Sequence, residues 1–313
     1  MQLVRGLHNL KPDHHGCVAT IGNFDGVHLG HQSVFRHLME KGVELDLPTT
    51  VVTFEPQPRE FFQAASAPAR LTRMREKLQA IKETGVQRVV VLEFNKRLAA
   101  MPADAFVKEL LVEGLGTRFL SVGDDFRFGR GREGDFELLR RMGREYAFEV
   151  ENMNTYKLDA DRVSSTRIRE LLTLGDLEGA AQCLGRPYRL CGRVAHGHKR
   201  GRSIGFPTMN INMHRRVSPL HGVYAVKLDG FGVKDLPGVA NIGNRPMVEG
   251  DHRYLLEVHL FDFNREVYGE HVSVEFVRKL REEQRFDTFE LLRQQILRDA
   301  DQARAILGVA DNA

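Results

Sequence analysis

Short apolar runs alternate with helical patterns in the first half of the chain. Runs rich in β-branched and aromatic residues predict strands at 17–21, 49–54, 86–94, 119–123 and 146–153. Helical periodicity lies between them, near 31–41, 73–84, 103–112 and 134–143. Several strand runs are almost continuously apolar, as a parallel sheet buried on both faces requires. The alternation predicts a doubly wound parallel sheet, which binds ligands beyond the carboxyl ends of its strands.

The pattern changes after a helical segment at 165–185. Short runs separated by Gly, Pro or Asp predict strands at 188–194, 222–228, 237–243, 253–261 and 271–277. Such spacing is typical of an antiparallel barrel or sandwich. Apolar residues at three- and four-residue steps predict a last amphipathic helix over 287–307. We therefore predict two domains, 1–185 and 186–313.

Composition narrows the class of protein. The 313 residues are 42% hydrophobic and 28% charged, which is ordinary for a soluble globular protein. The net charge is only +3 and no block of Lys or Arg stands out, so we expect no nucleic-acid partner. Because the N-terminus is polar and long apolar runs are lacking, we expect no signal peptide and no membrane span. Three scattered cysteines fit a reducing cytoplasm. The oligomeric state is not indicated.

A glycine-rich segment with two histidines, TIGNFDGVHLGH at 20–31, follows the first of these predicted strands. Its three glycines would let a polyphosphate approach the backbone, and the helix that follows offers amide donors at its N-terminus. The imidazoles of His28 and His31 could then stabilise charge on a phosphate under attack. A zinc pair is disfavoured because further ligands are not evident. A structural turn is the simpler alternative, which the position at a strand end weakens.

A second segment, SSTRIRE at 164–170, begins the helical stretch that ends at 185. A plain hydroxyl N-cap is the simpler interpretation. A capping box would place Glu or Gln three residues after the cap, yet Arg169 stands three residues after Thr166. Basic side chains in the first turn oppose the helix dipole unless an anion is bound there. We therefore favour a phosphate site. The GxGxxG match at 129–134 is separated from its strand, which disfavours a nicotinamide site.

Two strand patterns in the second half carry polar residues in unusual places. Thr208 and Asn210 alternate on one face of an otherwise apolar strand. Both are hard oxygen donors suited to Mg²⁺ that keeps waters and substrate phosphates as its other ligands. In LLEVHLF at 255–261, Glu257 and His259 lie on the face opposite Leu256 and its apolar neighbours. A solvated strand face is the simpler interpretation of that second pattern.

Four segments of the first half together resemble the adenylyltransferase module of bifunctional bacterial riboflavin kinase/FAD synthetases. They are GNFDGVHLGH, TFEPQPREFF at 53–62, VGDDFRFGRGREGD at 122–135 and SSTRIRELL at 164–172. HxGH and STxxR alone occur across a wider nucleotidyltransferase superfamily. The resemblance implies an α/β nucleotidyltransferase domain with a Rossmann-like parallel sheet. Family members often carry His where Gln57 stands, which leaves the role of Gln57 open.

The same resemblance implies roles for individual residues of the first domain. The catalytic residues would be His28, His31 and Arg169. The residues that bind the phosphates of ATP would be Gly22, Asn23, Phe24, His28, Gly30, His31, Ser165, Thr166 and Arg169. The residues that face the flavin of FMN would be Asp125, Phe126 and Phe128.

The second half resembles the riboflavin kinase module of the same enzymes, a small antiparallel β-barrel with a terminal helix. The segments that carry this resemblance are GRSIGFPTMNI, GVYAV at 222–226, GVANIGNRP at 238–246 and the stretch 256–286. The family's Pro-Thr-x-Asn motif falls on 207–210, with Met209 at its variable position. The resemblance implies that Glu257 takes the proton of the ribityl 5′-hydroxyl of riboflavin. It also implies ATP binding in the kinase by Gly197, Gly201, Thr208 and Asn210, of which Thr208 and Asn210 would also hold Mg²⁺.

The resemblance spans about residues 15–307 and implies two reactions. The barrel would phosphorylate riboflavin to FMN with ATP, and the α/β domain would adenylylate FMN to FAD with a second ATP, releasing pyrophosphate. Both reactions imply Mg²⁺, and neither implies a membrane partner. A nucleotidyltransferase for another phosphate ester is a rival that the flavin-side segments disfavour. A regulator with inactive modules would be expected to have lost Glu257, Thr208 or a histidine of HxGH, and all are present.

Overall fold

The computed structural model describes residues 1–123, 125–153, 157–158, 161–195, 206–246 and 252–310. They form two compact units. Unit 1 comprises Met1–Pro68 and Thr72–Ser164, and unit 2 comprises Ala69–Leu71 and Ser165–Ala313. The helical stretch 165–184, assigned above to the N-terminal domain, is grouped here with the barrel. The domain boundary at 185 stays a prediction.

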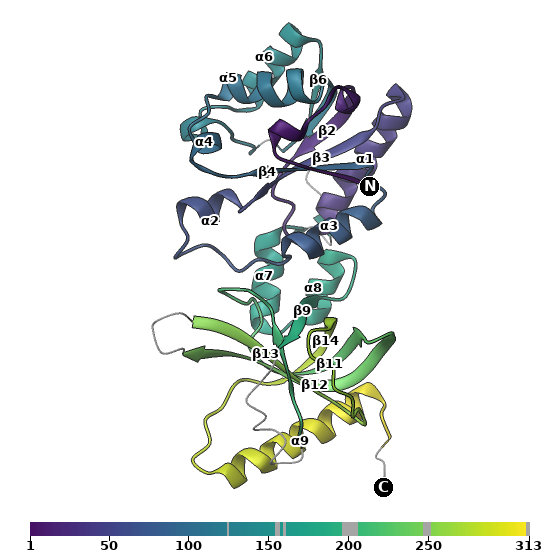
Figure 1. The fold of residues 1–313 in the computed structure, drawn as a ribbon, viewed down its shortest axis with the longest axis vertical. Coiled ribbons are helices and arrows are strands. Elements are labelled where there is room, and N and C mark those ends of the chain that lie inside the picture. Colours follow the sequence, from purple (N-terminus) through teal and green to yellow (C-terminus); the bar gives the residue numbers. More distant parts are fainter. Residues whose placement is uncertain (124, 154–156, 159–160, 196–205, 247–251, 311–313) are drawn as a thin grey trace. The chain divides into compact units, whose positions relative to one another are not determined.

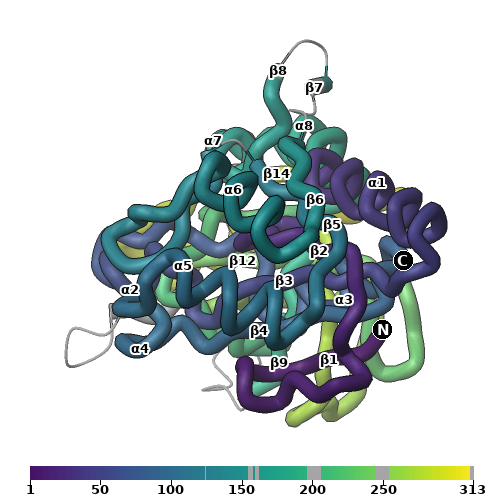
Figure 2. Tube along the Cα trace, turned by 90° about the horizontal axis from the view of Figure 1, so that it is seen from above, coloured from purple at the N-terminus to yellow at the C-terminus, as the bar shows by residue number. Residues whose placement is uncertain are grey.

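Unit 1 is built on a six-stranded sheet in which every neighbouring pair is parallel, which confirms the predicted sheet (Figure 1). Its strands are β1 (Gln2–Arg5), β2 (Cys17–Ile21), β3 (Thr49–Glu55), β4 (Arg88–Glu93), β5 (Thr117–Val122) and β6 (Glu149–Asn152). Their order across the sheet is β1-β4-β3-β2-β5-β6, and Figure 2 shows β3, β2, β5 and β6 side by side. The edge strand β1 was not predicted, because only Val4 of its four residues is buried.

Helices cover both faces of this sheet. They are α1 (Leu29–Leu45), α2 (Pro58–Phe62), α3 (Met74–Glu83), α4 (Lys96–Ala99), α5 (Ala103–Phe106), the π-helix η3 (Val107–Gly114) and α6 (Phe136–Tyr146). Three short 3₁₀ turns, η1 (Leu7–Asn9), η2 (Pro12–His14) and η4 (Arg130–Arg132), and a small two-stranded ladder, β7 (Lys157–Leu158) with β8 (Asp161–Arg162), complete the unit. One face packs on α1 and α3, through side chains such as Val51 and Val89. The other packs on α5, η3 and α6, through side chains such as Ile21 and Val52.

Unit 2 contains a closed six-stranded barrel with the strand order β10-β13-β12-β11-β14-β9. Its elements are α7 (Ser165–Leu174), α8 (Leu177–Leu184), β9 (Arg189–Ala195), β10 (Met209–Asn212), β11 (Gly222–Gly230), β12 (Val233–Pro246), β13 (His252–Leu260), β14 (His271–Arg281) and α9 (Phe289–Leu307). All six strand pairings are antiparallel. The barrel that the resemblance implies is therefore confirmed, and the sandwich alternative is wrong.

The terminal helix α9 packs on the outside of the barrel (Figure 1). Its buried Ala300 and Ala303 belong to the same apolar cluster as Val223 of β11. Arg281 of β14 and Asp299 of α9 form an ion pair at 2.7 Å, in which the carboxylate is almost fully buried. Because loss of either partner would leave a buried charge, this pair ties the helix to the barrel wall.

Candidate active sites

Three of the sequence motifs meet at one edge of the sheet in unit 1. β3, β2 and β5 are neighbours, with Ile21 opposite Val52 and Thr20 opposite Ser121. The glycine-rich loop, the last residues of TFEPQP and the segment from Asp125 to Gly129 therefore follow the carboxyl ends of three adjacent parallel strands. The chain leaves β2 for one side of the sheet and later returns as β5 on the other. Such a reversal of strand order is where doubly wound sheets bind ligands.

The two histidines of the glycine-rich loop form a stacked pair. His28 is the N-cap of α1 and its Nδ1 accepts the backbone N–H of His31 at 3.3 Å. The two rings lie 3.6 Å apart at an interplanar angle of 21°. In the neutral form, a ring whose Nδ1 accepts carries its proton on Nε2. The pair therefore places an N–H donor of His28 and the ring of His31 at the N-terminus of a helix, where anions are stabilised.

Unusual backbone geometry shapes this loop. Phe24 and Val27 have φ values of 47° and 44°, in the left-handed region that most side chains avoid. A Cβ on Gly22 would lie 2.9 Å from the ring of Phe24, and one on Gly30 would lie 3.1 Å from the ring of His28. These two glycines therefore make room for side chains of the loop itself, in addition to any ligand.

The residues predicted to face the flavin differ in exposure. Asp125 is exposed, and its carboxylate lies 3.9 Å from the guanidinium of Arg162. Phe126 is half-buried and stacks on Phe128 at 5.4 Å between ring centroids. Phe128 is buried in the core against Phe106. Asp125 and Phe126 are thus accessible to a ligand, whereas Phe128 is buried and packs against the ring of Phe126.

Gln57 lies in the segment after β3, where it is the N-cap of α2. The residue is only 8% exposed. Its side-chain nitrogen is buried and has no hydrogen-bond partner within the described ranges. Gln57 therefore offers a buried amide N–H donor in the segment that follows β3. Its role stays open.

The STxxR residues lie at the start of α7, in unit 2. Thr166 is exposed and Ser165 is half-buried. The guanidinium of Arg169 donates through Nε to the carbonyl oxygen of Ala69 at 2.6 Å. Their roles in binding phosphate stay predictions. Gly197 and Gly201 lie outside the described residues.

A row of polar residues runs across three neighbouring strands of the barrel. Asn210 of β10 lies opposite Glu257 of β13, which in turn lies opposite Asn241 of β12. Residues directly opposite each other in neighbouring strands have Cβ atoms about 5 Å apart on one face. Leu256 and Val258 are fully buried and point to the barrel interior, so the row lies on the outer face. Thr208, two residues before Asn210, is exposed.

The oxygen donors of this row fit a magnesium ion. The side-chain oxygen of Asn210 is buried and has no hydrogen-bond partner among the residues that the structure describes. Carboxamide, hydroxyl and carboxylate oxygens are the ligand types that Mg²⁺ takes together with substrate phosphates. The oxygen donors of Thr208 and Asn210 are therefore compatible with the predicted metal.

His259 holds the segment next to this row. Its Nδ1–H donates to the carbonyl oxygen of Pro207 at 2.9 Å, and its ring lies 4.8 Å from that of Phe206. Burial lowers the pKa of His259 below its ordinary value of 6.5; the hydrogen bond to Pro207 opposes this shift, and the charge of Arg304 adds to it. A neutral imidazole therefore anchors the residue that precedes Thr208.

We expect this histidine to make unit 2 less stable in acid. Because the pKa of His259 is lower in the folded than in the unfolded state, the unfolded state binds more protons below about pH 6.5. The free energy of unfolding should therefore fall as the pH drops below that value. Urea unfolding of the wild type and of His259→Gln between pH 5 and 8 measures this. Equal pH slopes in the two proteins would contradict it.

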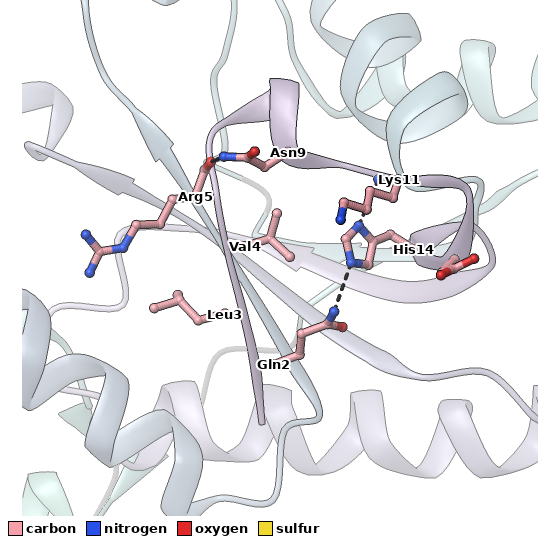
Figure 3. A pocket seen from close by; sticks show the side chains of 8 residues that line it. Gln2, Leu3, Val4, Arg5, Asn9, Lys11 and His14 are labelled. Carbon is pink, nitrogen blue, oxygen red and sulfur yellow. Dashed lines mark hydrogen bonds between the residues drawn. The ribbon is translucent and has the colours of Figure 1, made fainter.

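A cavity of about 490 Å³ lies along the edge strand β1 (Figure 3). Within it, His14 accepts the backbone N–H of Lys11 at Nδ1, and its Nε2 lies 2.9 Å from the side-chain nitrogen of Gln2. None of the predicted site residues lines this cavity. We therefore assign it no part in either reaction.

Three residues beside the candidate sites were not predicted from the sequence. Thr72 and Lys77 contact the glycine-rich loop, and Asn241 lies opposite Glu257. Lys77 could have been noticed from the sequence, because it stands three and four residues before Ala80 and Ile81 and so lies on the buried face of α3. The other two become visible only through strand pairing and long-range contacts.

Two family models match the chain in succession. A model described as FAD synthetase matches residues 10–167, and one described as riboflavin kinase matches residues 184–307. The fold and both matches place the chain in a class of two-module enzymes that synthesise flavin nucleotides. None of the helices in the described ranges combines the length and apolar content needed to cross a membrane.

Curated relatives match over the full length of the chain. Proteins named bifunctional riboflavin kinase/FMN adenylyltransferase are 53% identical in Pseudomonas fluorescens, over 98% of both chains, and 50% identical in Escherichia coli K12, over 100% of both. The chain belongs to the family of bifunctional riboflavin kinase/FMN adenylyltransferases. A solved structure titled as a macrolide-efflux protein from Streptococcus pneumoniae is 28% identical, with a TM-score of 0.80 over 97% of this chain and 99% of that one.

Proposed function

We propose that the two activities of this bifunctional enzyme are divided between residues 1–185, which adenylylate FMN to FAD, and residues 186–313, which phosphorylate riboflavin to FMN. One observation carries this division. The HxGH loop and the flavin-side segments meet at the carboxyl ends of β3, β2 and β5 in unit 1, whereas Asn210 and Glu257 are paired on the barrel of unit 2. The HxGH loop and the residues assigned to FMN therefore lie in unit 1, and the residues assigned to the kinase lie in unit 2. Ser165, Thr166 and Arg169 belong to the proposed domain 1–185, although the start of α7 is grouped with unit 2.

In the kinase reaction, Glu257 orients the ribityl 5′-hydroxyl of riboflavin and accepts its proton as the γ-phosphoryl group of ATP is transferred. A carboxylate in phosphoryl transfer acts mainly by positioning, because most of the charge develops on the phosphate oxygens. Thr208 and Asn210 would hold Mg²⁺, which offsets that charge when bound. Asn241, opposite Glu257, is placed to orient its carboxylate. Gly197 and Gly201 are assigned to ATP binding on the resemblance alone.

In the adenylyltransferase reaction, the phosphate of FMN attacks the α-phosphorus of ATP and pyrophosphate leaves. No protein nucleophile is needed, so the residues act by positioning and by stabilising charge. His28 and His31 donate to the phosphates of ATP at the N-terminus of α1, helped by backbone groups of the loop from Gly22 to Gly30. Ser165, Thr166 and Arg169 are assigned to ATP, and Asp125 with Phe126 to FMN. A cytoplasmic location also stays a proposal.

A product assay tests the proposal directly. Purified protein incubated with riboflavin, ATP and Mg²⁺ should form FMN first and FAD after it, as separated by chromatography. With FMN supplied in place of riboflavin, FAD should appear without a lag. Chelation of Mg²⁺ by EDTA should stop both reactions, and added Mg²⁺ should restore them. FAD formation from riboflavin without transient FMN would contradict the two-step scheme.

A further inference from the structure

A lysine side chain lies fully buried directly behind the glycine-rich loop. Lys77 projects from α3 and is 0% exposed. Its ammonium group donates to the carbonyl oxygen of Asn23 at 2.6 Å and to the hydroxyl of Thr53 at 3.4 Å. Moving an ammonium group from water into a protein interior is costly unless it is hydrogen-bonded there. The short contact with Asn23 therefore marks a point at which the loop is tightly held.

This contact fixes the orientation of the peptide group between Asn23 and Phe24. In a planar trans peptide, the carbonyl oxygen and the N–H that follows it point in opposite directions. Because Lys77 holds the carbonyl oxygen of Asn23 within unit 1, the N–H of Phe24 points away from Lys77. Phe24 has a φ of 47°, a conformation that is strained for a phenylalanine. Lys77 thus stabilises a peptide orientation that the side chain of Phe24 disfavours.

The same stretch of chain holds the loop at a second point. Thr72, two residues before α3, donates its backbone N–H and its hydroxyl to Oδ1 of Asp25 at 3.0 and 3.3 Å. The oxygen of that hydroxyl also accepts the backbone N–H of Gly26 at 2.9 Å. Asp25 and Thr72 are both buried. Thr72 and Lys77 together therefore hold three residues of the loop from one side.

We propose that Lys77, together with Thr72, positions the glycine-rich loop for the adenylylation of FMN, and that Lys77 is the main positioning residue. It holds the Asn23–Phe24 peptide, and with it the donors of the loop, in the orientation that receives the phosphates of ATP. The inference rests on the proposed assignment of residues 22–31 to ATP. A displacement of about 1 Å in a group that positions substrate can lower a rate by about 100-fold, even when the change is remote from the chemistry. The kinase reaction does not use this loop and should not depend on Lys77.

The variant Lys77→Met tests this, because it removes the ammonium group and keeps most of the apolar side chain. With FMN supplied, kcat/KM for ATP in adenylylation should fall about 100-fold. The affinity for FMN, measured by quenching of flavin fluorescence, should stay near that of the wild type, whereas loss of the fold of unit 1 would abolish it. Riboflavin phosphorylation by the same preparation is the internal reference. Lys82→Met, at an exposed position of the same helix, is the matched control.

Conservative replacement separates positioning from simple packing. Lys77→Arg keeps a buried cationic donor and should recover about tenfold of the loss in kcat/KM for ATP relative to Lys77→Met. Three results would each overturn the proposal: failure of this rescue, a kcat/KM for ATP of Lys77→Met close to that of Lys82→Met, or an FMN affinity that falls by the same factor as kcat/KM for ATP.

A second variant tests the positioning of the loop if Lys77→Met is insoluble. Thr72→Val removes the hydroxyl between Asp25 and the N–H of Gly26, and the proposal requires a selective loss for ATP there too. Unchanged ATP kinetics in Thr72→Val would then overturn it. If instead the variants of His28 and His31 still make FAD, the assignment of the loop to ATP fails, which is a different result from any obtained with Lys77.

Discussion

Replacing both His28 and His31 by Ala should leave a protein that converts riboflavin to FMN and then stops. The two imidazoles stack 3.6 Å apart at the N-terminus of α1, where they would donate to phosphates under attack. Removing a single donor of this kind typically costs a factor of 10²–10³, so the double variant should lose at least about 10³-fold in FAD formation. Chromatography of products from riboflavin, ATP and Mg²⁺ should show FMN accumulating without FAD.

A matched control for this variant lies on the same helix. His37 pairs on the surface with Glu151 at 3.1 Å, and His37→Ala should keep both activities. The single variants His28→Ala and His31→Ala show which ring matters more. Continued synthesis of FAD by the double variant at a wild-type rate would refute the placement of the adenylylation site in this loop.

Replacing Glu257 by Gln should have the opposite effect on the two reactions. The carboxylate lies between Asn210 and Asn241 on the outer face of the barrel, and its amide isostere keeps the shape but cannot take a proton. General-base groups contribute about 10²–10⁴-fold, so riboflavin phosphorylation should fall by about 10³-fold. Supplied FMN should still be adenylylated at the wild-type rate, as a coupled pyrophosphate assay would show.

Glu270→Gln is the matched control for this change, since Glu270 is exposed in the turn before β14. Both reactions of that variant should match the wild type. If Glu257→Gln slows both reactions equally, the division of activities between residues 1–185 and 186–313 is wrong. If it slows neither, Glu257 is not the residue that receives the proton.

Local patterns predicted most elements because short-range chemistry sets them. The run 49–54 consists only of Thr, Val and Phe, residues that favour strands, and all six are buried in β3, so its strand was found at almost the correct bounds. The helical stretch 165–185 is interrupted at Gly175, whose φ of 79° ends α7 before α8 begins. The short edge strand β1 was missed because four residues with one buried side chain carry too weak a pattern.

The residues of the candidate sites also fall into two groups, those that are adjacent in the chain and those that are brought together only by folding. The HxGH loop was found because its glycines, its histidines and the strand before it are adjacent in the chain. Lys77 was missed because its partner Asn23 is 54 residues away and no motif joins them. Asn241 was missed because its relation to Glu257 exists only through the register of β12 and β13.

The order of the elements, the two-part organisation and the chemical types of residue at the strand ends all follow from local patterns in the chain. Three features became visible only in the folded chain: β3, β2 and β5 are neighbours, the barrel closes through β9 and β10, and an ammonium group is buried behind the loop. These two groups of features depend on interactions that act over different distances along the chain. Backbone propensity and hydrophobic periodicity act over a few residues, whereas strand order, register and burial depend on contacts between segments far apart in the chain.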